Sequence, residues 1–406
     1  MRILAVSQYY WPEPFNVADI CEELAARGHE VTVLTGIPNY PEGDVYPGYD
    51  AKRGIEEERN GVRIVRVPLR PRKSGAVNRF LNYESFSRNA SRKARRLREK
   101  FDVVFAYEVS PVMSANPAIA YAKANGVPCV IYVLDIWPEC LLMGGITKNS
   151  AIYRHYRHVS SRIYSSADVL AVSSPRFIDY LKPMVSDGVV YEYLPQYAED
   201  IFAGGSHGKT LQEPGLLGGY APDGFDLTFA GNVGAAQAVG DIVHAAKCLD
   251  SSVRIHVVGS GSELARCKEI AAEDGSTNVF FHGRHPIEVM PSFYAASDAL
   301  VVSFANSPVV GYTLPRKVQT YLAAGKPLVG AVLGEARKVI EEAGCGLVCD
   351  PESPEAFAEV CKEFAASSAA KRAEWASNAR NYYESNFERG LFFDNLERIL
   401  DKAASV

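Results

Sequence analysis

Runs of consecutive apolar residues alternate with helix-like stretches along the first half of the chain. Between these runs, VADICEELAARG (17–28) and PAIAYAKANG (117–126) read as helices, and each ends at a glycine. Near-continuous apolar strands that alternate with helices are typical of a parallel sheet covered on both faces. The predicted strands are RILAVS (2–7), HEVTVLTG (29–36), RIVRVPL (63–69), FDVVFAY (101–107), PCVIYVLD (128–135) and DVLAVS (168–173).

The second half restarts this alternation after a Gly- and Pro-rich stretch at 201–224, which we interpret as a linker or a surface excursion. With 406 residues the chain is too long for one ordinary core. The pattern therefore predicts an α/β fold with two doubly wound parallel-sheet domains, at 1–200 and 201–384. The strands of the second domain are expected within 225–234, 253–263, 278–284, 299–304, 327–332 and 346–350.

The segment TLPRKVQTYLAAGKP (313–327) has the end signals of a short helix, with Pro315 at its start and Gly325 and Pro327 after its last turn. The free amides of a first helical turn attract anions, and Arg316 and Lys317 add positive charge there. This stretch alone leaves two interpretations open. It is an anion site, or it is a capped amphipathic helix whose basic pair faces water.

Polar residues and glycines follow the predicted strands of both halves. Open sheets of this kind bind ligands beyond the carboxyl ends of their strands, so these positions are expected to face a common cleft. Each signal is weak when taken alone, because tight turns need glycine and a strand-end Asp can be a helix cap. The residues concerned are Asn232 and Gly234, Gly259 and Gly261, His282 to Arg284, Tyr9 to Asn16, Glu108 and Asp135.

Composition narrows the function classes. The chain is 47% hydrophobic and 22% charged, and its net charge of −5 argues against a general nucleic-acid binder. The start MRILAVSQYY lacks the apolar stretch of a signal peptide, and no run approaches the roughly 18 apolar residues of a membrane span. The eight scattered cysteines indicate neither a zinc site nor a disulfide framework, so we expect reduced thiols in a cytoplasmic protein.

As an ordered set, several motifs resemble the family 4 retaining glycosyltransferases over nearly the whole chain. FAGNVG, GSGSE, HGRHP, TLPRKVQTYLAAGKPLVGA and EEAGCGLVCDPESPEAFAEV are similar to the donor half of that family. YYWPEPFNVADICEELAARGHEVTVLTG, YVLDIWPE and VSSPRFIDYL are similar to its acceptor half. Within the family the chain looks most like bacterial enzymes of capsule, O-antigen and exopolysaccharide synthesis, including the fucosamine-transferase type.

The resemblance implies the GT-B architecture of two facing Rossmann-like domains, with a C-terminal helix at 385–406 that packs back on the first. It assigns catalysis to Asp135 and Glu108 and an acceptor-side loop to Glu13, Pro14, Phe15 and Asn16. It also implies a helix at 313–327 that holds the diphosphate of a nucleotide sugar. The donor-binding residues it implies are Asn232, Gly234, His282, Gly283, Arg284, Tyr312, Thr313, Leu314, Lys317, Gln319 and Thr320.

Two departures from the family pattern affect the donor pocket. The family has two glutamates with seven residues between them, and at those positions this chain has Tyr312 and Thr320. The family also has an Arg and a Lys in the first donor-side loop, where this chain has Asn232 and Gln237. A dianion needs compensating charge, and Arg284 and Lys317 are the substitutes we expect. The ribose could be held by Gln319 or by Thr320.

The implied activity is transfer of a sugar, with retention, from a nucleoside diphosphate (UDP favoured) to a lipid-linked saccharide. No metal or cofactor is expected. Two alternatives stay open: an isomerase of the nucleotide-sugar 2-epimerase type, and a non-catalytic nucleotide-sugar-binding partner of another transferase. An assay of donor without acceptor separates the isomerase from the transferase.

The segment 70–100 is strongly basic, with eleven Lys or Arg residues against Glu84 and Glu99 only. Apolar residues such as Val77, Phe80 and Leu81 tend to one helical side. A solvated surface helix would explain this pattern. Because the family's acceptors are lipid-linked, we instead expect the segment to hold the enzyme on an anionic membrane, at the inner face of the cell membrane.

Overall fold

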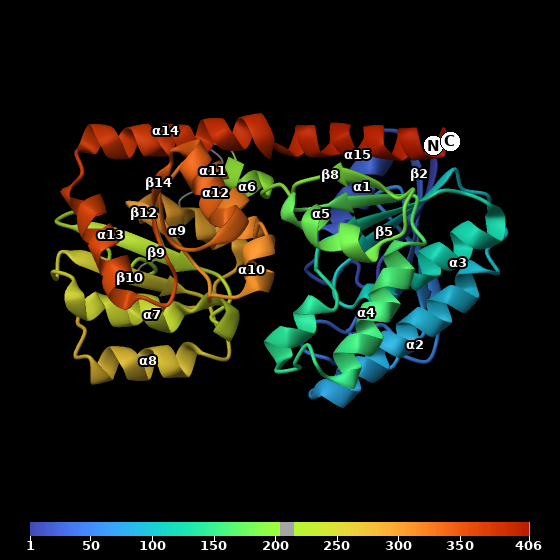
Figure 1. The fold of residues 1–406 in the computed structure, drawn as a ribbon, viewed down its shortest axis with the longest axis horizontal. Helices are drawn as coiled ribbons and strands as arrows, with labels where there is room; N and C mark the ends of the chain where they lie inside the picture. Colours follow the sequence, from blue (N-terminus) through green and yellow to red (C-terminus); the bar gives the residue numbers. More distant parts are fainter. Residues whose placement is uncertain (204–214, 406) are drawn as a thin grey trace. The chain divides into compact units, whose positions relative to one another are not determined.

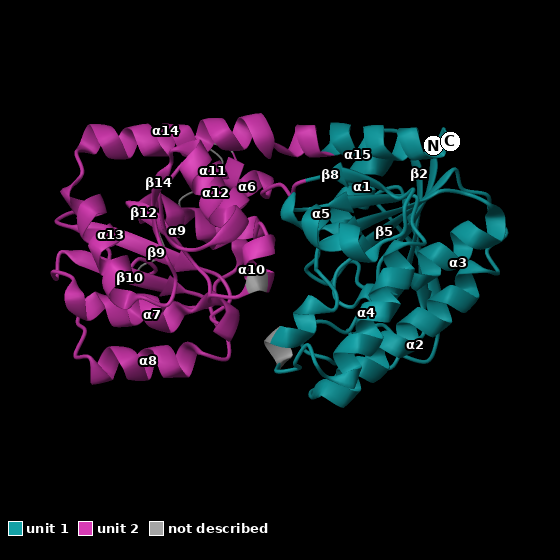
Figure 2. Cartoon of the chain, in the orientation of Figure 1, with its two compact units in different colours: residues 1–194, 393–406 teal, residues 195–392 magenta. Residues whose placement is uncertain are grey.

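The computed structural model describes residues 1–203 and 215–405, which form two compact units (Figure 2). Unit 1 comprises 1–194 and 393–406, and unit 2 comprises 195–392. The chain thus passes from unit 1 to unit 2 between Leu194 and Pro195, and it returns between Phe392 and Phe393. The linker predicted at 201–224 falls partly outside the described residues, at 204–214.

Unit 1 is built on an eight-stranded sheet in the order β3-β4-β2-β1-β5-β6-β7-β8. The six strands predicted for this half are present, and the pairs between them are parallel. The strands are β1 (Arg2–Val6), β2 (Glu30–Gly36), β3 (Ile55–Arg59), β4 (Val62–Val67), β5 (Val103–Glu108), β6 (Cys129–Val133), β7 (Val169–Val172) and β8 (Val190–Tyr193).

The edge strand β3, of sequence IEEER, is antiparallel to β4. The prediction of a purely parallel sheet is therefore wrong at this edge. This strand was not predicted, because its three consecutive glutamates leave it without a run of apolar residues. They are stable there because an edge strand keeps one side in water, and because Glu57 pairs with the buried Arg66 of β4 at 2.5 Å.

Helices cover both faces of this sheet. Figure 1 shows α2, α3 and α4 together on one side, with α1 and α15 on the other. Helix α15 joins unit 1 through buried Phe393, Leu396 and Leu400. The helices of unit 1 are α1 (Val17–Ala26), α2 (Ala76–Ala94), α3 (Asn116–Asn125), α4 (Ala151–Tyr164), α5 (Arg176–Leu181) and, from Phe393 onward, α15 (Arg389–Ala404).

Unit 2 is built on a six-stranded parallel sheet in the order β11-β10-β9-β12-β13-β14, as the second run of strands predicted. Its strands are β9 (Phe225–Ala230), β10 (Val253–Val258), β11 (Val279–Gly283), β12 (Ala299–Ser303), β13 (Leu328–Ala331) and β14 (Gly346–Cys349). Its helices are α6 (Asp200–Ala203), α7 (Val239–Ala245), α8 (Leu264–Glu273), α9 (Met290–Ala296), α10 (Pro308–Tyr312), α11 (Arg316–Ala323), α12 (Gly334–Ala343), α13 (Pro354–Ala366) and α14 (Ala369–Asn386).

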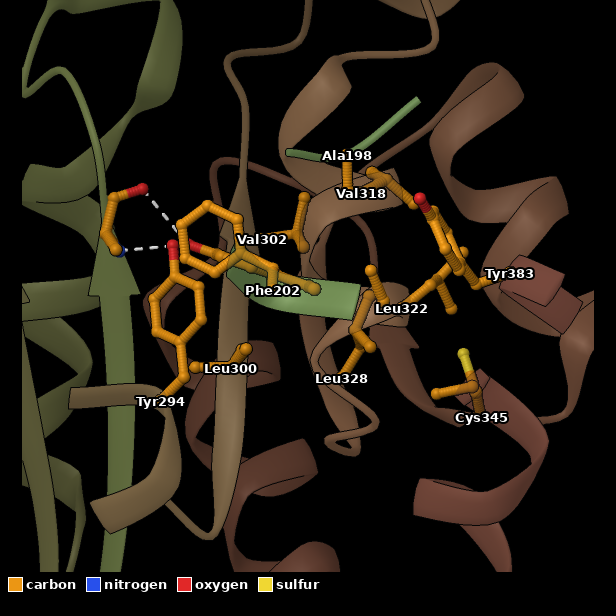
Figure 3. Close-up of a cluster of buried hydrophobic side chains, with 14 of the residues drawn as sticks. Ala198, Phe202, Tyr294, Leu300, Val302, Val318, Leu322, Leu328, Cys345 and Tyr383 are labelled. Atoms are coloured by element: carbon orange, nitrogen blue, oxygen red, sulfur yellow. Dashed lines mark hydrogen bonds between the residues drawn. The ribbon is translucent and has the colours of Figure 1, made fainter. Parts of the chain in front are cut away.

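Two apolar clusters form the core of unit 2, one on each face of its sheet. Strand β12 supplies Leu300 and Val302 to one cluster and its alternate residues to the other, as the pleat requires. Figure 3 shows the first cluster, in which Val318 and Leu322 of α11 contribute beside these strand residues. The apolar side of α11 therefore holds the helix on the sheet. Its first turn lies near the carboxyl edge of the sheet.

Candidate functional site

Three turns meet at the carboxyl edge of the unit 2 sheet. The Gly231 N–H donates to the Val258 carbonyl at 2.9 Å, and the Gly259 N–H donates to the Gly283 carbonyl at 2.7 Å. Gly231 and Gly259 have φ values of +135° and +152°, and a Cβ on Gly259 would collide with the carbonyl of Gly231. Gly259, which was predicted from sequence, and Gly231 of the FAGNVG motif thus let the ends of β9, β10 and β11 pack backbone against backbone.

Lys317 reaches this edge from the first turn of α11. Its Cε and Nζ lie 3.2 Å from the position that a Cβ of Gly231 would occupy. The Nζ lies 3.6 Å from the ring centroid of Phe229 and is buried, with no hydrogen-bonding partner in the structure described for residues 1–203 and 215–405. Burial lowers the pKa of this amine from 10.5 to about 7. A buried cation beside glycine turns and a helix start is suited to an anion.

The predicted helix is α11, which begins at Arg316 directly after Pro315. The two cations of its first turn have different roles. Arg316 forms an ion pair with Glu199, whereas Lys317 faces the Gly231 turn. The sequence left two interpretations open, an anion site and a water-facing basic pair. The structure favours the anion site for Lys317 but not for Arg316, which is paired with Glu199.

Asn232 and Gln237, which replace the family's Arg and Lys, bond each other across the first turn. The Asn232 Nδ2 donates to the Gln237 Oε1 at 3.1 Å. A Cβ on Gly234 would meet this pair at 2.6 and 3.1 Å. Arg284, which directly follows β11, is exposed, and no ion pair of the described residues includes it. Asn232, Gly234 and Gly283 thus lie at the edge that Lys317 reaches.

Gln319 and Thr320, the two candidates for ribose binding, are engaged within α11. Gln319 is fully buried, and in the amide orientation that satisfies its nitrogen it donates to the Pro315 carbonyl at 2.8 Å. The Thr320 hydroxyl donates to the Arg316 carbonyl at 3.1 Å. A ribose contact by either residue stays a prediction.

Of the three predicted donor-binding residues just before α11, Leu314 is engaged in packing. Tyr312 ends the short helix α10, and the Thr313 hydroxyl donates back to the Val309 carbonyl at 3.1 Å. Leu314 is 1% exposed and belongs to the apolar cluster of Figure 3. Its side chain is therefore unavailable to a ligand, and only its backbone could contribute to donor binding.

His282 ends a buried polar chain across three neighbouring strands. Its Nε2 lies 3.0 Å from the Nδ1 of His256, and the His256 Nε2 lies 2.8 Å from the Asp226 carboxylate. Burial lowers the pKa of His256, and it lowers the pKa of His282 from 6.5 to about 4. Burial tends to raise the pKa of Asp226, but hydrogen bonds from His256 and Arg254 outweigh it and keep the carboxyl ionised. The Nε2 of His282 is thus engaged by His256.

In unit 1, Glu13 ties together the loops that follow β1 and β2. Its carboxylate, 3% exposed, accepts from the backbone N–H groups of Tyr10 at 3.1 Å, Asn39 at 2.9 Å and Tyr40 at 2.8 Å. Burial raises the pKa of Glu13 to about 7, although these bonds oppose the shift. Glu13 therefore positions the predicted acceptor-side loop, and its oxygens are already occupied.

The rest of that loop is more open. Pro14 is exposed, and Phe15 and Asn16 are partly exposed at the start of α1. The Phe15 ring stacks on Tyr9 at a centroid distance of 4.6 Å and an interplanar angle of 8°. An aromatic surface that is partly open to solvent suits the apolar face of a sugar.

Sequence reasoning missed Arg72 at this same group of loops. Its guanidinium lies over the rings of Tyr40 and Tyr83, at 5.1 and 5.6 Å, and donates to the Tyr9 hydroxyl at 2.9 Å. Among the residues described here, no carboxylate pairs with Arg72. One of many cations in a basic segment, it carries no local signal, and its place follows only from the folded loops.

Glu108 and Asp135 lie at the carboxyl ends of the neighbouring strands β5 and β6, as predicted, but their environments differ. Glu108 is 0% exposed, and neither carboxylate oxygen has a hydrogen-bonding partner in the described chain. Burial, with the nearby Asp135 charge, raises the pKa of Glu108 well above 4.5. Asp135 is partly exposed and accepts from the Ser110 N–H at 2.8 Å. Of these two carboxylates, only Asp135 is accessible to a ligand.

Within 1–203 and 215–405, no three His, Cys, Asp or Glu side chains are grouped as a metal site would require. Over the same residues no helix is both long and apolar enough to cross a bilayer. All eight cysteines carry free thiols.

Known protein families match both units of the chain. Residues 16–195 match the family described as "Glycosyl transferase 4-like domain", and residues 221–382 match "Glycosyl transferases group 1". The chain is 28% identical over 254 residues to a probable glycosyltransferase of Pseudomonas aeruginosa, WbjE, covering 61% of this chain and 62% of that protein. It is 26% identical over 380 residues to the putative colanic acid biosynthesis glycosyl transferase WcaI of Escherichia coli K12, covering 88% and 90%.

Solved structures agree with this fold. The sucrose-phosphate synthase of Thermosynechococcus elongatus superposes with a TM-score of 0.75 at 17% identity, over 99% of this chain and 98% of that one. Anabaena HepE, determined with UDP and glucose, superposes with a TM-score of 0.71 at 14% identity, over 99% of both chains. The fold is therefore GT-B, as predicted, and the chain is a glycosyltransferase that carries a 4-like domain followed by a group 1 domain.

Proposed function

We propose that this glycosyltransferase takes its sugar from a nucleoside diphosphate, with UDP favoured, bound at the carboxyl edge of unit 2. The observation that carries the proposal is the buried, unpartnered Nζ of Lys317 beside the Gly231 turn. A diphosphate at this position would give the ammonium the partner it lacks and would meet the free amides of the first turn of α11. HepE, of the same fold, was determined with UDP, which supports the choice of base.

We further propose a retaining mechanism without a metal. Departure of the sugar leaves negative charge on the diphosphate, which Lys317 and the amides of α11 would stabilise. Arg284, exposed after β11, would reinforce them. Asp135 would orient the acceptor or stabilise the positive charge that develops on the sugar. Lys317 and Arg284 would thereby supply the charge that two loop cations supply in the wider family.

The proposed acceptor is a lipid-linked saccharide of bacterial surface-polysaccharide synthesis, such as a capsule or O-antigen repeat unit. The name of WcaI, a putative colanic acid biosynthesis enzyme, supports this class of product. The open aromatic loop of Phe15 and the basic segment 70–100 support a sugar linked to a lipid. The enzyme would then work at the inner face of the cell membrane, held by that segment on anionic lipid.

Isothermal titration of UDP and of uridine tests the donor site. Lys317→Met removes the charge while keeping an unbranched side chain, and Lys338→Met at an exposed position of α12 is the matched control. We expect Lys317→Met to weaken UDP binding by roughly 1.5–3 kcal/mol, the range for a charge-assisted bond, while uridine binding is unchanged. An equal loss for both ligands would refute the site.

Incubation with a donor alone and then with a membrane extract as acceptor tests the activity. A transferase consumes UDP-sugar substantially only when the acceptor is present. Conversion of the donor alone into its 2-epimer would identify an isomerase instead. Binding of UDP with no turnover of any donor would identify a non-catalytic partner.

A further inference from the structure

A groove in unit 1 runs between α2, α3 and α4, which lie together on one side of the sheet in Figure 1. It has a volume of about 930 Å³. Five cationic side chains line it, and no acidic side chain does. The cations are Arg88, Arg92 and Arg95 from α2 and its C-cap, Lys123 from α3 and Arg162 from α4.

Most of this positive charge is not neutralised by the protein. Arg88 pairs with Glu84 at 3.2 Å, but for the other four cations the described residues supply no ion pair. Lys123 instead donates to the Ser166 hydroxyl at 3.1 Å. Like charges gathered in one hollow repel each other, so the groove favours an anion that is shared between them.

The groove also has a defined floor. Ser87 and Ser91 are buried hydroxyl residues, and Ile119 and Ile163 are buried apolar residues. The Asn116 amide donates to the Ser87 hydroxyl at 3.0 Å. Hydroxyl and amide groups beneath a cationic rim suit phosphate oxygens, which accept hydrogen bonds from both.

Helix α2 combines this cationic groove with exposed apolar residues on the same face. Val77, Phe80, Arg88 and Arg92 follow one another at spacings that repeat on one side of a helix. Val77 is 72% exposed and Phe80 44% exposed in the first turns, while the arginines lie in the later turns. On the neighbouring helix α4, Ile152 is 52% exposed in the first turn. Exposed apolar tips beside cations are typical of a surface that meets lipid.

We propose that this groove binds the phosphate of an anionic phospholipid headgroup, with Val77, Phe80 and Ile152 inserted among the acyl chains. The groove draws on three helices, so it extends the membrane surface proposed for segment 70–100 to Lys123 and Arg162. The inference rests on the proposed function only for its choice of a membrane as the source of phosphate. A soluble phosphate compound would satisfy the cations but would leave the apolar tips uncovered.

Vesicle co-sedimentation tests this with two variants of equal charge loss. Arg92→Gln/Arg95→Gln/Lys123→Gln empties the groove of three cations. Arg96→Gln/Arg98→Gln/Lys100→Gln removes three exposed cations just outside it. The vesicles are phosphatidylcholine alone or an equimolar mixture with phosphatidylglycerol, at low and at high salt. UDP titration and thermal unfolding check that unit 2 and the fold are unchanged, which separates a failure here from a failure of the proposed donor site.

We expect the chain to bind the phosphatidylglycerol vesicles in a salt-dependent manner and to be released by soluble glycerol phosphate. The groove variant should lose about a hundredfold in affinity, because each of its three cations contacts the headgroups and contributes on the order of a fivefold factor. The outer variant should lose only several-fold, because its three cations lie outside the groove and act on the anionic surface from a distance. Phe80→Ser should weaken binding at high salt as well. Equal losses in the two charge variants would refute the claim that the groove is the site of lipid binding. Binding of inorganic pyrophosphate at the groove, without any binding to vesicles, would refute the claim that its ligand is a phospholipid.

Discussion

The hydroxyl of Tyr321 bonds both backbone groups of Ala230. It accepts from the Ala230 N–H at 2.9 Å and donates to the Ala230 carbonyl at 3.0 Å. Tyr321 is fully buried on α11, and Ala230 is the last residue of β9, directly before the Gly231 turn. Lys317 lies one turn earlier on the same helix. The hydroxyl therefore sets the distance between the ammonium and the turn it faces.

Tyr321→Phe should lower stability by about 1–3 kcal/mol, because it leaves both Ala230 groups buried without this partner. The apolar ring still fills its space, so the loss is specific to the hydroxyl. Urea unfolding measures it, and UDP affinity should fall with it. Tyr10→Phe is the control, since the buried Tyr10 hydroxyl has no partner in the described residues. If the control costs as much, the two bonds to Ala230 contribute nothing specific.

The binding of UDP should depend on pH through Lys317. In the free protein its pKa is about 7, because the amine is buried. Above that pH the free site is neutral and must take up a proton when a diphosphate binds, so affinity should fall as pH rises above 7. Calorimetry at about pH 8 in two buffers of different ionisation enthalpy should show proton uptake approaching one. Lys317→Met should abolish this uptake; if the uptake persists, another group is responsible.

Lys317→Met should also stabilise the ligand-free protein near neutral pH. The lowered pKa of Lys317 means that the unfolded chain binds a proton that the folded chain does not. Folding stability is therefore lost as pH falls from about 10 to about 7, and it stays reduced below that. Removing the amine should recover on the order of 2 kcal/mol in urea unfolding, whereas Lys338→Met should recover none. A destabilised Lys317→Met would contradict the idea that stability is given up here for binding.

The strands, and the glycine turns at the carboxyl edge of unit 2, were predictable because local signals determine them. Near-continuous apolar runs marked strands such as β1 and β9, since parallel strands are buried on both faces. Glycines marked the turns at Gly231 and Gly259, because close backbone approach excludes a side chain. Pro315 marked the start of α11, and the lysine beside it proved to face the Gly231 turn.

The remaining features depend on contacts between distant segments. The charged edge strand β3 has no apolar run, and its partner Arg66 becomes visible only once β4 is paired. Gln319 was a candidate for binding the ribose, but its amide donates to backbone carbonyls at the start of its own helix. The groove of unit 1 needs Lys123 and Arg162, which no pattern in segment 70–100 could bring beside Arg92.

The His256–His282 pair should make unit 2 sensitive to acid. Burial lowers the pKa of both imidazoles, to about 4 for His282, so the folded state keeps them neutral where the unfolded chain is protonated. Stability should be full above about pH 6.5 and should fall as pH drops from there toward 4. His282→Gln should remove on the order of 2 kcal/mol of this loss in urea unfolding across that range. His158→Gln, exposed on α4, should leave the slope unchanged, and equal slopes in all three proteins would refute the assignment.

The two carboxylates proposed for catalysis should separate in a pair of amide substitutions. Asp135→Asn keeps the oxygen that accepts from the Ser110 N–H, so the loop should stay in place while the charge is lost. Turnover should fall by about a hundredfold or more, as for other electrostatic contributions to a transition state, with UDP affinity nearly unchanged. Glu108→Gln is nearly isosteric and replaces a fully buried carboxyl whose pKa burial raises well above 4.5, so turnover should change only a few-fold. Steady-state kinetics with donor and acceptor varied in turn measures both. Parental turnover in Asp135→Asn would reduce Asp135 to a structural role, and a large loss in Glu108→Gln would mean that its proton is exchanged during transfer.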